Sequence, residues 1–244
     1  MQIGAQLYTV RAHCTNLADF ADTLQKIAAI GYKTVQVSGT CAYEPEWLAE
    51  QLRKNGLRCV LTHIPPDKIA ETPEQVAAAH KIFGCGGVGI GHYDLEACGV
   101  DAFAQRFRPA GRILGQEGLR LSYHNHDGEF RQIDGKTVLE RLAEAFPPEE
   151  MYFTLDTYWV QAGGGDPIAW LDKLSGRTPY VHLKDMAYGR KMAPVGAGNM
   201  NFTGILEACL RNGVEYALVE QDDCYGEDPF ACLQRSFDYL KDFA

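Results

Sequence analysis

The sequence predicts an α/β protein built as a closed (β/α)8 barrel, and three observations support this fold. Short apolar runs alternate with amphipathic stretches along the whole chain, which is typical of repeated βα units. Eight of the apolar runs fit as strands. The length of 244 residues is close to the size of about 250 residues that is usual for this barrel. We therefore expect one TIM-barrel domain over residues 1–244.

The eight expected strands are short and rich in β-branched and aromatic residues. A doubly wound open sheet would show the same alternation of strands and helices, so periodicity alone leaves it open. Eight βα units within 244 residues favour a closed barrel. The expected strands are Ile3–Tyr8, Thr34–Ser38, Arg58–His63, Gly87–His92, Arg120–His124, Tyr152–Asp156, Tyr180–Lys184 and Tyr216–Glu220.

Helices are expected between the strands, because the connecting segments carry apolar stripes at helical spacing. The clearest stripes run over residues 17–28 and 230–240. Several helix starts place a capping residue before a proline, as in Asp166-Pro167 and Asp228-Pro229. Thr72-Pro73 does the same, and Gln75 is expected to complete a capping box with Thr72. The expected helix stops are Gly31, Gly56 and Gly213.

Composition narrows the class of protein. A formal net charge of −9 makes nucleic-acid binding improbable without a concentrated basic patch, and the sequence has none. No apolar run reaches the length of about 18 residues that a membrane span needs, so no membrane partner is expected. The eight cysteines form no CxxC pair, which favours free thiols and a cytoplasmic location over a disulfide framework.

Histidine and carboxylate side chains gather at the expected strand ends. In a (β/α)8 barrel the C-terminal ends of the strands surround the functional mouth. Five of the seven histidines lie at or just after such an end. The residues at these positions are Tyr8, Ser38, His63, His92, His124, His126, Asp156, His182, Lys184 and Glu220.

Four of these residues end strands five to eight and suit a divalent metal. They are His124, Asp156, His182 and Glu220. Imidazole and carboxylate ligands together bind Mn²⁺, Co²⁺, Zn²⁺ or Mg²⁺. Any one of them alone is explained as a satisfied polar group at a strand end, but four on successive strands indicate a metal site.

Four segments of the sequence are typical of a known protein superfamily. They are Tyr123-His124-Asn125-His126, Leu155–Trp159, Val181–Asp185 and Pro194–Gly198. With them the whole chain resembles the sugar phosphate isomerase/epimerase superfamily of xylose isomerase-like barrels. That resemblance implies one metal held by Glu, Asp, His and Glu from strands five to eight, of which the last three correspond to Asp156, His182 and Glu220.

The chain departs from the pattern of that superfamily at two positions. His124 stands where many members carry a Glu; it could keep the metal, leave a three-ligand site, or leave room for Glu129 from the next loop. Because strand residues alternate, His126 shares a face with His124 and is a candidate acid/base or substrate contact. Trp159 stands where ketose epimerases often carry a substrate-binding His, so it is either a sugar-stacking wall or a packed aromatic.

The superfamily also contains the endonuclease IV enzymes, and the sequence argues against that activity. His63 and His92 resemble ligands of such enzymes, but Trp159 replaces a required His and residues 186–200 contain none. We therefore predict His63 and His92 as substrate contacts. Lys184 and Arg190 are predicted to bind an anionic substrate group, with surface ion pairs as the alternative. Residues 196–198 could offer backbone N–H groups to an anion, or simply form a helix-entry turn.

The resemblance and the strand ends together predict a metal-dependent isomerase or epimerase acting on a ketose, keto-sugar or inosose. Proton removal beside the carbonyl would give an enediolate, with Glu220, His126 or His124 as the proton-transferring residue. A dehydratase or lyase sharing that intermediate is the runner-up. A non-catalytic sugar-binding barrel with a degenerate metal site is the alternative from another class. The expected partner is a small carbohydrate, and self-association into a homo-oligomer stays open.

Overall fold

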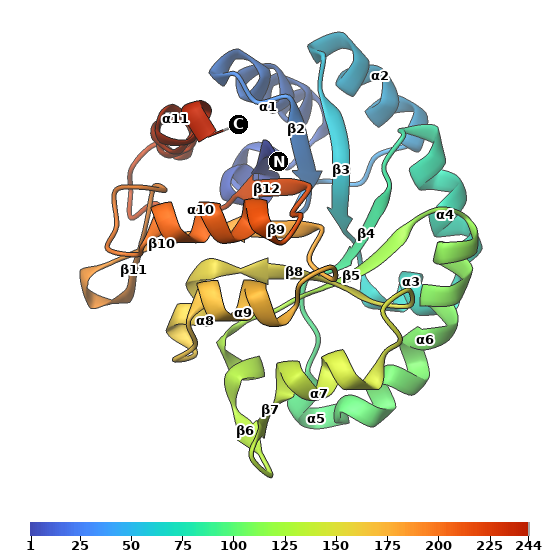
Figure 1. Ribbon diagram of the computed structural model, residues 1–244. Helices are drawn as coiled ribbons and strands as arrows, with labels where there is room; N and C mark the ends of the chain where they lie inside the picture. The colour runs from blue at the N-terminus through green and yellow to red at the C-terminus, as the bar shows by residue number, and fades with distance from the viewer. Residues whose placement is uncertain (244) are drawn as a thin grey trace.

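The computed structural model describes residues 1–243, and its centre is a closed barrel of eight parallel strands. The strand order around the barrel is β1-β12-β9-β8-β5-β4-β3-β2, so the last strand closes the barrel against the first. Helices surround the barrel, and both termini lie near each other beside β12 (Figure 1). The barrel strands are β1 (Gln2–Gln6), β2 (Thr34–Val37), β3 (Arg58–His63), β4 (Gly87–Ile90), β5 (Arg120–His124), β8 (Tyr152–Asp156), β9 (Tyr180–Leu183) and β12 (Tyr216–Val219).

Helices cover the outside of the barrel, and two small hairpins project from its rim (Figure 1). The hairpins are β6 (Gln132–Ile133) with β7 (Lys136–Thr137), and β10 (Asp185–Ala187) with β11 (Lys191–Ala193). The α-helices are α1 (Leu17–Ile30), α2 (Pro45–Asn55), α3 (Pro66–Glu71), α4 (Pro73–Ile82), α5 (Leu95–Cys98), α6 (Val100–Gln116), α7 (Val138–Ala145), α8 (Thr157–Ala162), α9 (Pro167–Lys173), α10 (Phe202–Arg211) and α11 (Pro229–Leu240). Short 3-10 helices are η1 (Leu7–His13), η2 (Asp127–Phe130), η3 (Tyr188–Arg190) and η4 (Lys241–Phe243).

The barrel strands agree with the predicted strands to within two residues at each end. The prediction that Tyr8 ends the first strand is wrong, because β1 stops at Gln6 and Tyr8 lies in η1 with 37% of its surface exposed. The Gln6 side chain accepts a hydrogen bond from the Tyr8 N–H at 3.2 Å and caps this turn. Tyr8 therefore does not end a strand.

The predicted helix starts and stops are largely confirmed. Asp166 and Asp228 cap α9 and α11, accepting backbone N–H bonds at 3.0 and 3.1 Å. Gly31 and Gly56 follow α1 and α2 with positive φ, which favours glycine. The capping box at Thr72 is wrong: its hydroxyl donates to the Lys68 carbonyl at 3.0 Å, because the residue also ends α3.

Side chains that alternate along each strand fill the interior of the barrel. Tyr216, Leu218 and Glu220 share one face of β12 and its extension, and this face points inward. At the N-terminal end the Tyr216 and Tyr180 rings stack with centroids 5.9 Å apart, beside a cluster of Val60, Leu61, Tyr180 and Leu218. Polar and ionisable side chains fill the C-terminal end.

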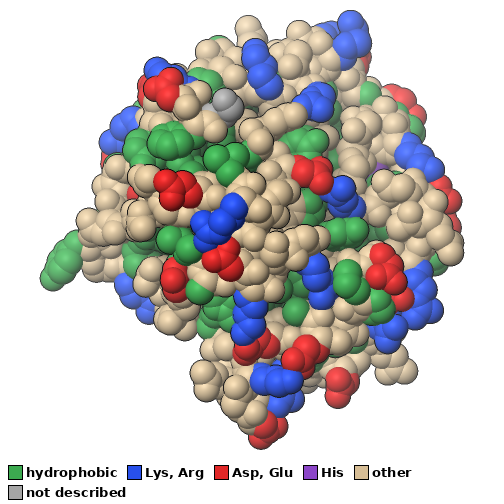
Figure 2. All heavy atoms as spheres, viewed as in Figure 1, with side chains coloured by type: hydrophobic (Ala, Val, Ile, Leu, Met, Phe, Trp, Pro, Cys, Tyr) green, Lys and Arg blue, Asp and Glu red, His purple; other side chains and the backbone are tan. Residues whose placement is uncertain are grey.

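The remaining global features fit the composition. On the face seen in Figure 2, acidic and basic side chains are interspersed, without a large basic patch. None of the helices within residues 1–243 combines the length and apolar character needed to cross a bilayer. All eight cysteines have free thiols, as predicted.

Candidate metal centre and active site

Four side chains from neighbouring strands meet at the C-terminal end of the barrel. His124 ends β5, Asp156 ends β8, His182 lies in β9, and Glu220 directly follows β12. These strands are consecutive around the barrel, so their ends lie side by side. One nitrogen or oxygen atom from each residue lies within 4.8 Å of the others, and all four residues are buried.

The start of α8 and the Asn125 side chain fix the direction of the Asp156 carboxylate. Asp156 is the N-cap of α8, and its Oδ1 accepts the Trp159 N–H at 2.9 Å. The Asn125 side chain accepts the Asp156 N–H at 3.0 Å and fixes the backbone. Oδ2 is thereby left facing His124 Nε2 at 3.2 Å. One carboxylate therefore both starts a helix and supplies a donor atom to the cluster.

Hydrogen bonds outside the cluster set which nitrogen of each histidine faces it. His124 Nδ1 donates to the Gly91 carbonyl at 3.0 Å, which turns Nε2 toward Asp156 Oδ2 at 3.2 Å. His182 Nε2 lies 2.7 Å from Gln36 Oε1 and donates to it, which leaves Nδ1 facing Glu220 Oε2 at 3.0 Å. Such outer hydrogen bonds are the usual means of orienting metal-binding imidazoles.

The donor set fits a divalent cation. His182 Nδ1 and Glu220 Oε2 are both buried, yet neither makes a hydrogen bond of normal geometry. Imidazole nitrogens and carboxylate oxygens, two of each within 4.8 Å of one another, are the ligand types that Mn²⁺, Co²⁺ and Zn²⁺ accept. A cation among these atoms would coordinate His182 Nδ1 and Glu220 Oε2, two buried atoms that make no hydrogen bond of normal geometry within the protein.

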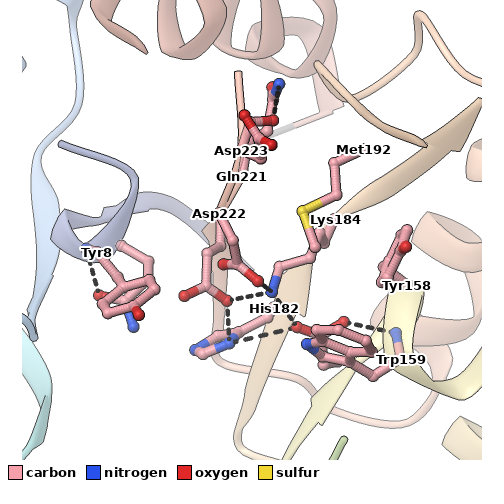
Figure 3. A network of polar contacts seen from close by, with 12 residues as sticks. Tyr8, Tyr158, Trp159, His182, Lys184, Met192, Gln221, Asp222 and Asp223 are labelled. Carbon is pink, nitrogen blue, oxygen red and sulfur yellow. Dashed lines mark hydrogen bonds and ion pairs between the residues drawn. The ribbon is translucent and has the colours of Figure 1, made fainter. Parts of the chain in front are cut away.

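Lys184 brings a buried positive charge to the same carboxylates (Figure 3). Its Nζ lies 3.1 Å from Asp156 Oδ2, 2.8 Å from Glu220 Oε2 and 3.0 Å from Asp222 Oδ2. Burial opposes the charge on Lys184, but the three carboxylates outweigh it and raise its pKa. Burial likewise opposes ionisation of Asp156 and Glu220, and Lys184 leads the contacts that hold the pKa of each carboxyl well below its usual range. The ammonium and both carboxylates are therefore charged at neutral pH.

The same charges act on His182. Burial favours the neutral imidazole, but Glu220 and Asp156 together raise the pKa of His182 to about 9. In the metal-free protein His182 therefore holds a proton at neutral pH, and that proton lies between the two carboxylates. A metal ligand needs the nitrogen lone pair, so metal binding would release this proton.

Further aromatic rings form a wall beside the cluster. The His63 ring lies 5.4 Å from that of His124 and 5.7 Å from that of His182, measured between centroids. The His126 ring lies 4.7 Å from His124 and 5.3 Å from Trp159. Burial, with help from neighbouring histidines, lowers the pKa of His63 well below its usual value and that of His126 to about 3. Both rings are therefore neutral at physiological pH.

Two other predicted contact residues lie farther out. His92 is exposed, and its ring meets that of His126 edge to face at 5.4 Å. Arg190 lies in η3 between β10 and β11, where its Nη2 is 3.5 Å from Asp127 Oδ2 and donates to the Ala162 carbonyl. The structure does not bring Arg190 into contact with the four cluster residues. Its substrate-binding role stays a prediction.

Glu129, the alternative strand-five ligand, is held elsewhere. Its two carboxylate oxygens accept the Tyr123 hydroxyl and the His126 N–H, both at 2.7 Å. The structure thus places His124 in the cluster and keeps Glu129 out of it.

The glycine loop at residues 196–198 is also engaged within the protein. Asp185 Oδ2 accepts the Gly196 and Gly198 N–H groups at 3.0 and 2.9 Å. These N–H groups therefore already have a carboxylate partner, which favours a structural turn over an anion site.

Two residues of the site were not predicted from the sequence. Asp222 binds Lys184, and Gln36 orients His182. The alternation of strand residues could have found both, because Asp222 lies two residues after Glu220 and Gln36 two residues before Ser38.

A cavity of about 720 Å³ adjoins the cluster at His63. It lies between the loops after β2 and β3 and helix α4, and its walls include Val37, Tyr43, Ile64 and Phe83. This size is within the range of small-molecule sites.

The chain is similar to a known protein family over most of its length. The family model for the xylose isomerase-like TIM barrel matches residues 24–242. Among curated proteins, an inosose dehydratase of Geobacillus kaustophilus (strain HTA426) is 33% identical over 79 residues, which are 32% of this chain and 25% of that protein. An inosose dehydratase of Bacillus cereus (strain AH820) is 30% identical over 35% of this chain and 28% of its own length. The aligned stretch is thus about a quarter of each dehydratase.

Solved structures share the architecture at low sequence identity. A sugar phosphate isomerase/epimerase from Parabacteroides distasonis superposes with a TM-score of 0.84 and 22% identity, covering 98% of this chain and 93% of that chain. An L-ribulose 3-epimerase gives 0.76 and 14%, covering 99% and 94%. A probable 3-DHS dehydratase from Bacillus anthracis gives 0.73 and 17%, covering 99% of each chain. At these identities the likeness concerns the fold.

Proposed function

The chain belongs to the xylose isomerase-like TIM barrel family, and we propose that it is a divalent-metal-dependent isomerase or epimerase of keto-sugars or inososes. The convergence of His124, Asp156, His182 and Glu220 at the barrel mouth supports this proposal most directly. A bound divalent cation supplies Lewis-acid polarisation of a substrate carbonyl, which acidifies the neighbouring C–H bond. The proposed ligands are these four residues, with His124 in place of a carboxylate.

The protein's own groups would then bind the substrate and move its proton. Glu220 is ionised and buried, so its free carboxylate oxygen is the proposed base for the α-proton. His126 is neutral, with its Nδ1 buried and unpartnered, and is the proposed relay, which donates its ring N–H proton to the substrate while its other nitrogen accepts one in exchange. Lys184 places a fixed positive charge where negative charge develops on the substrate oxygen.

The surrounding wall suits a compact polyol. Trp159 is half-buried beside His126 and Lys184, with Lys184 Nζ 5.4 Å from the ring centroid. An indole face can stack on the C–H face of a sugar ring, and the neutral imidazole of His63 can hydrogen-bond hydroxyl groups. We propose His63, His92 and Trp159 as substrate contacts on this basis.

A dehydratase is the second candidate, and two observations favour it. Curated relatives that align with part of the chain are inosose dehydratases. In addition, His124 stands where a strand-five carboxylate would supply a second carboxylate base, and elimination of a β-hydroxyl needs one base where epimerisation needs two. Both reactions begin with the same removal of an α-proton.

Proton exchange in D₂O tests the shared step and separates the outcomes. The Mn²⁺-loaded protein is incubated with a panel of ketoses and inososes, and the products are followed by NMR. Deuterium at a single carbon of one substrate is expected. An inverted centre identifies an epimerase, a moved carbonyl an isomerase, and a new C=C–C=O chromophore a dehydratase.

Two variants sharpen that experiment. Glu220→Gln is expected to abolish exchange, because the amide cannot accept the proton. Glu215→Gln is the matched control, since Glu215 precedes the other end of the same strand, where it pairs with Arg120 at 2.6 Å on the surface. Absence of exchange with every substrate, in protein shown to contain stoichiometric Mn²⁺, would contradict the proposed function.

A further inference from the structure

We propose that Lys184 is a built-in cation that shares the carboxylates of the metal site, and that Asp222 is the positioning residue that holds it there. The proposal rests on the metal site of the proposed function and concerns how tightly that site binds a cation. The proposal also assigns a role to Asp222, which is not one of the four cluster residues.

The contacts of Lys184 show that its charge is shared among three carboxylates. An ammonium has three N–H donors, and three carboxylate oxygens lie within 3.1 Å of Nζ. Two of those oxygens, Asp156 Oδ2 and Glu220 Oε2, also face the cluster histidines. Lys184 and a metal would therefore draw on the same two atoms.

The third oxygen belongs to Asp222, and it shares the positive charge of Lys184 with Asp156 and Glu220. Its carboxylate lies against Lys184 Nζ, with Oδ2 3.0 Å away (Figure 3). The Asp222 backbone carbonyl accepts Arg11 Nη1 at 3.0 Å, which fixes this segment, whereas Oδ1 is buried without a hydrogen-bond partner. Lys184 is thus the main polar partner of the Asp222 side chain. Removing Asp222 would leave the whole charge of Lys184 on Asp156 and Glu220.

The formal charges give the sign of each effect. Three carboxylates and one ammonium leave a net charge of −2, which one divalent cation neutralises if both histidines are neutral. Lys184→Met makes this −3 and removes a nearby positive charge, so a divalent cation should bind more tightly. Asp222→Asn makes it −1 and shifts the ammonium onto the metal's ligands, so the cation should bind more weakly.

The test is a double-mutant cycle on Mn²⁺ affinity, measured by isothermal titration calorimetry without substrate. We expect Lys184→Met to lower the Kd at least about tenfold and Asp222→Asn to raise it at least about tenfold. In the Lys184→Met background, Asp222→Asn should change the Kd less than it does in the wild type, because only the direct charge effect of Asp222 remains once Lys184 is absent. Lys184→Arg keeps the charge and is expected to lie near the wild type.

Melting curves with EDTA and with Mn²⁺ provide the second readout. Lys184→Met leaves three carboxylates together, so it should melt well below the wild type in EDTA and recover when Mn²⁺ is added. Failure of Mn²⁺ to restore it, or an Mn²⁺ affinity equal to or weaker than wild type, would overturn the role of Lys184. An equal effect of Asp222→Asn in both backgrounds would overturn the positioning role of Asp222.

These outcomes are separable from those of the proposed function. A protein that shows the expected Mn²⁺ shifts but exchanges no deuterium with any substrate keeps this inference and loses the enzymatic proposal. A protein that exchanges deuterium but shows none of the Mn²⁺ affinity shifts keeps the enzymatic proposal and loses this inference.

Discussion

The two ends of the barrel interior are built from the same strands but from opposite kinds of side chain. At the N-terminal end, Tyr180 of β9 stacks on Tyr216 of β12 beside the buried Leu218. At the C-terminal end, the same two strands supply His182 and lead into Glu220. Two residues along β9 and four along β12 thus separate the tyrosine and leucine packing from a cluster of buried charges.

The difference between the two ends indicates how the fold tolerates a site whose buried charged groups lower its stability. Buried carboxylates and imidazoles lose hydration, and their mutual contacts repay only part of that cost. Tyrosine and leucine packing at the other end stabilises the fold without taking part in the chemistry. We therefore expect substitutions at the C-terminal end to change metal binding, and substitutions at the N-terminal end to change the free energy of unfolding.

The largest expected effect is the loss of metal binding in Asp156→Asn. The amide keeps the N-cap bond to Trp159 but removes the negative charge facing His124. Mn²⁺ affinity should fall more than about a hundredfold, beyond the usual effect of an outer-sphere change. Melting curves with and without Mn²⁺ measure this, because bound metal raises the melting temperature of the wild type. An unchanged Mn²⁺-induced shift in Asp156→Asn would contradict the assignment of this end as the metal site.

Leu218→Ala is expected to lower the stability of the fold and to leave metal binding nearly unchanged. Leu218 is fully buried in the barrel interior, so its truncation leaves a cavity. Stability should fall by about 2–5 kcal/mol in urea denaturation. Mn²⁺ affinity should stay within about threefold of wild type, because Leu218 supplies no donor atom to the cluster even though it pairs with His182 in the sheet. A large loss of Mn²⁺ affinity in this variant would show that the two ends are coupled.

Gly91→Ala probes the packing at the C-terminal end, where Gly91 directly follows β4. A Cβ at Gly91 would lie 2.6 Å from His63 Nδ1 and 2.9 Å from its Cγ, so the ring could not keep its place. We expect a loss of about 1–3 kcal/mol, the usual cost of overpacking. His63→Ala should relieve most of that loss, and urea denaturation of the single and double variants measures the coupling. Equal losses in the two backgrounds would assign the cost to the backbone instead.

The fold was predictable because it depends on repeating local signals. Alternating apolar runs, caps such as Asp166 and helix-stop glycines such as Gly31 recur along the chain, and errors at one unit do not disturb the rest. The errors arose where one residue serves two elements. Thr72 ends one helix and starts the next, and Gln6 turns the chain before Tyr8.

The site was predictable only in part. Strand alternation brought His124, Asp156, His182 and Glu220 together, because their position on the inner face follows from sequence. The length and direction of a side chain do not follow in the same way. Lys184 could have reached solvent or a substrate, and only the packed barrel shows its ammonium among three carboxylates. Glu129 was equally available by sequence, yet its hydrogen bonds to Tyr123 and His126 hold it outside the cluster.

The smallest expected effect concerns pH, which should move stability in opposite directions with and without metal. The pKa of His182 is raised to about 9 by Glu220 and Asp156 against the effect of burial, whereas an unfolded histidine titrates near about 6.5. In EDTA the bound proton therefore contributes stability below about pH 6.5, and this contribution is lost as the pH rises through about 9. The Mn²⁺ form needs His182 unprotonated, so metal affinity should instead rise with pH by up to about tenfold per unit until about pH 9.

Calorimetry in two buffers of different ionisation enthalpy distinguishes this proton from others. At about pH 7.5 each Mn²⁺ bound should release close to one proton from the wild type. Leu218→Ala should release the same number, because its change lies at the apolar end and leaves Glu220 and Asp156 in place. His182→Gln should bind Mn²⁺ weakly and release almost no proton. Proton release that is absent from the wild type, or unchanged in His182→Gln, would mean that the charges at the C-terminal end do not act on His182, and the contrast between the two ends would lose its electrostatic basis.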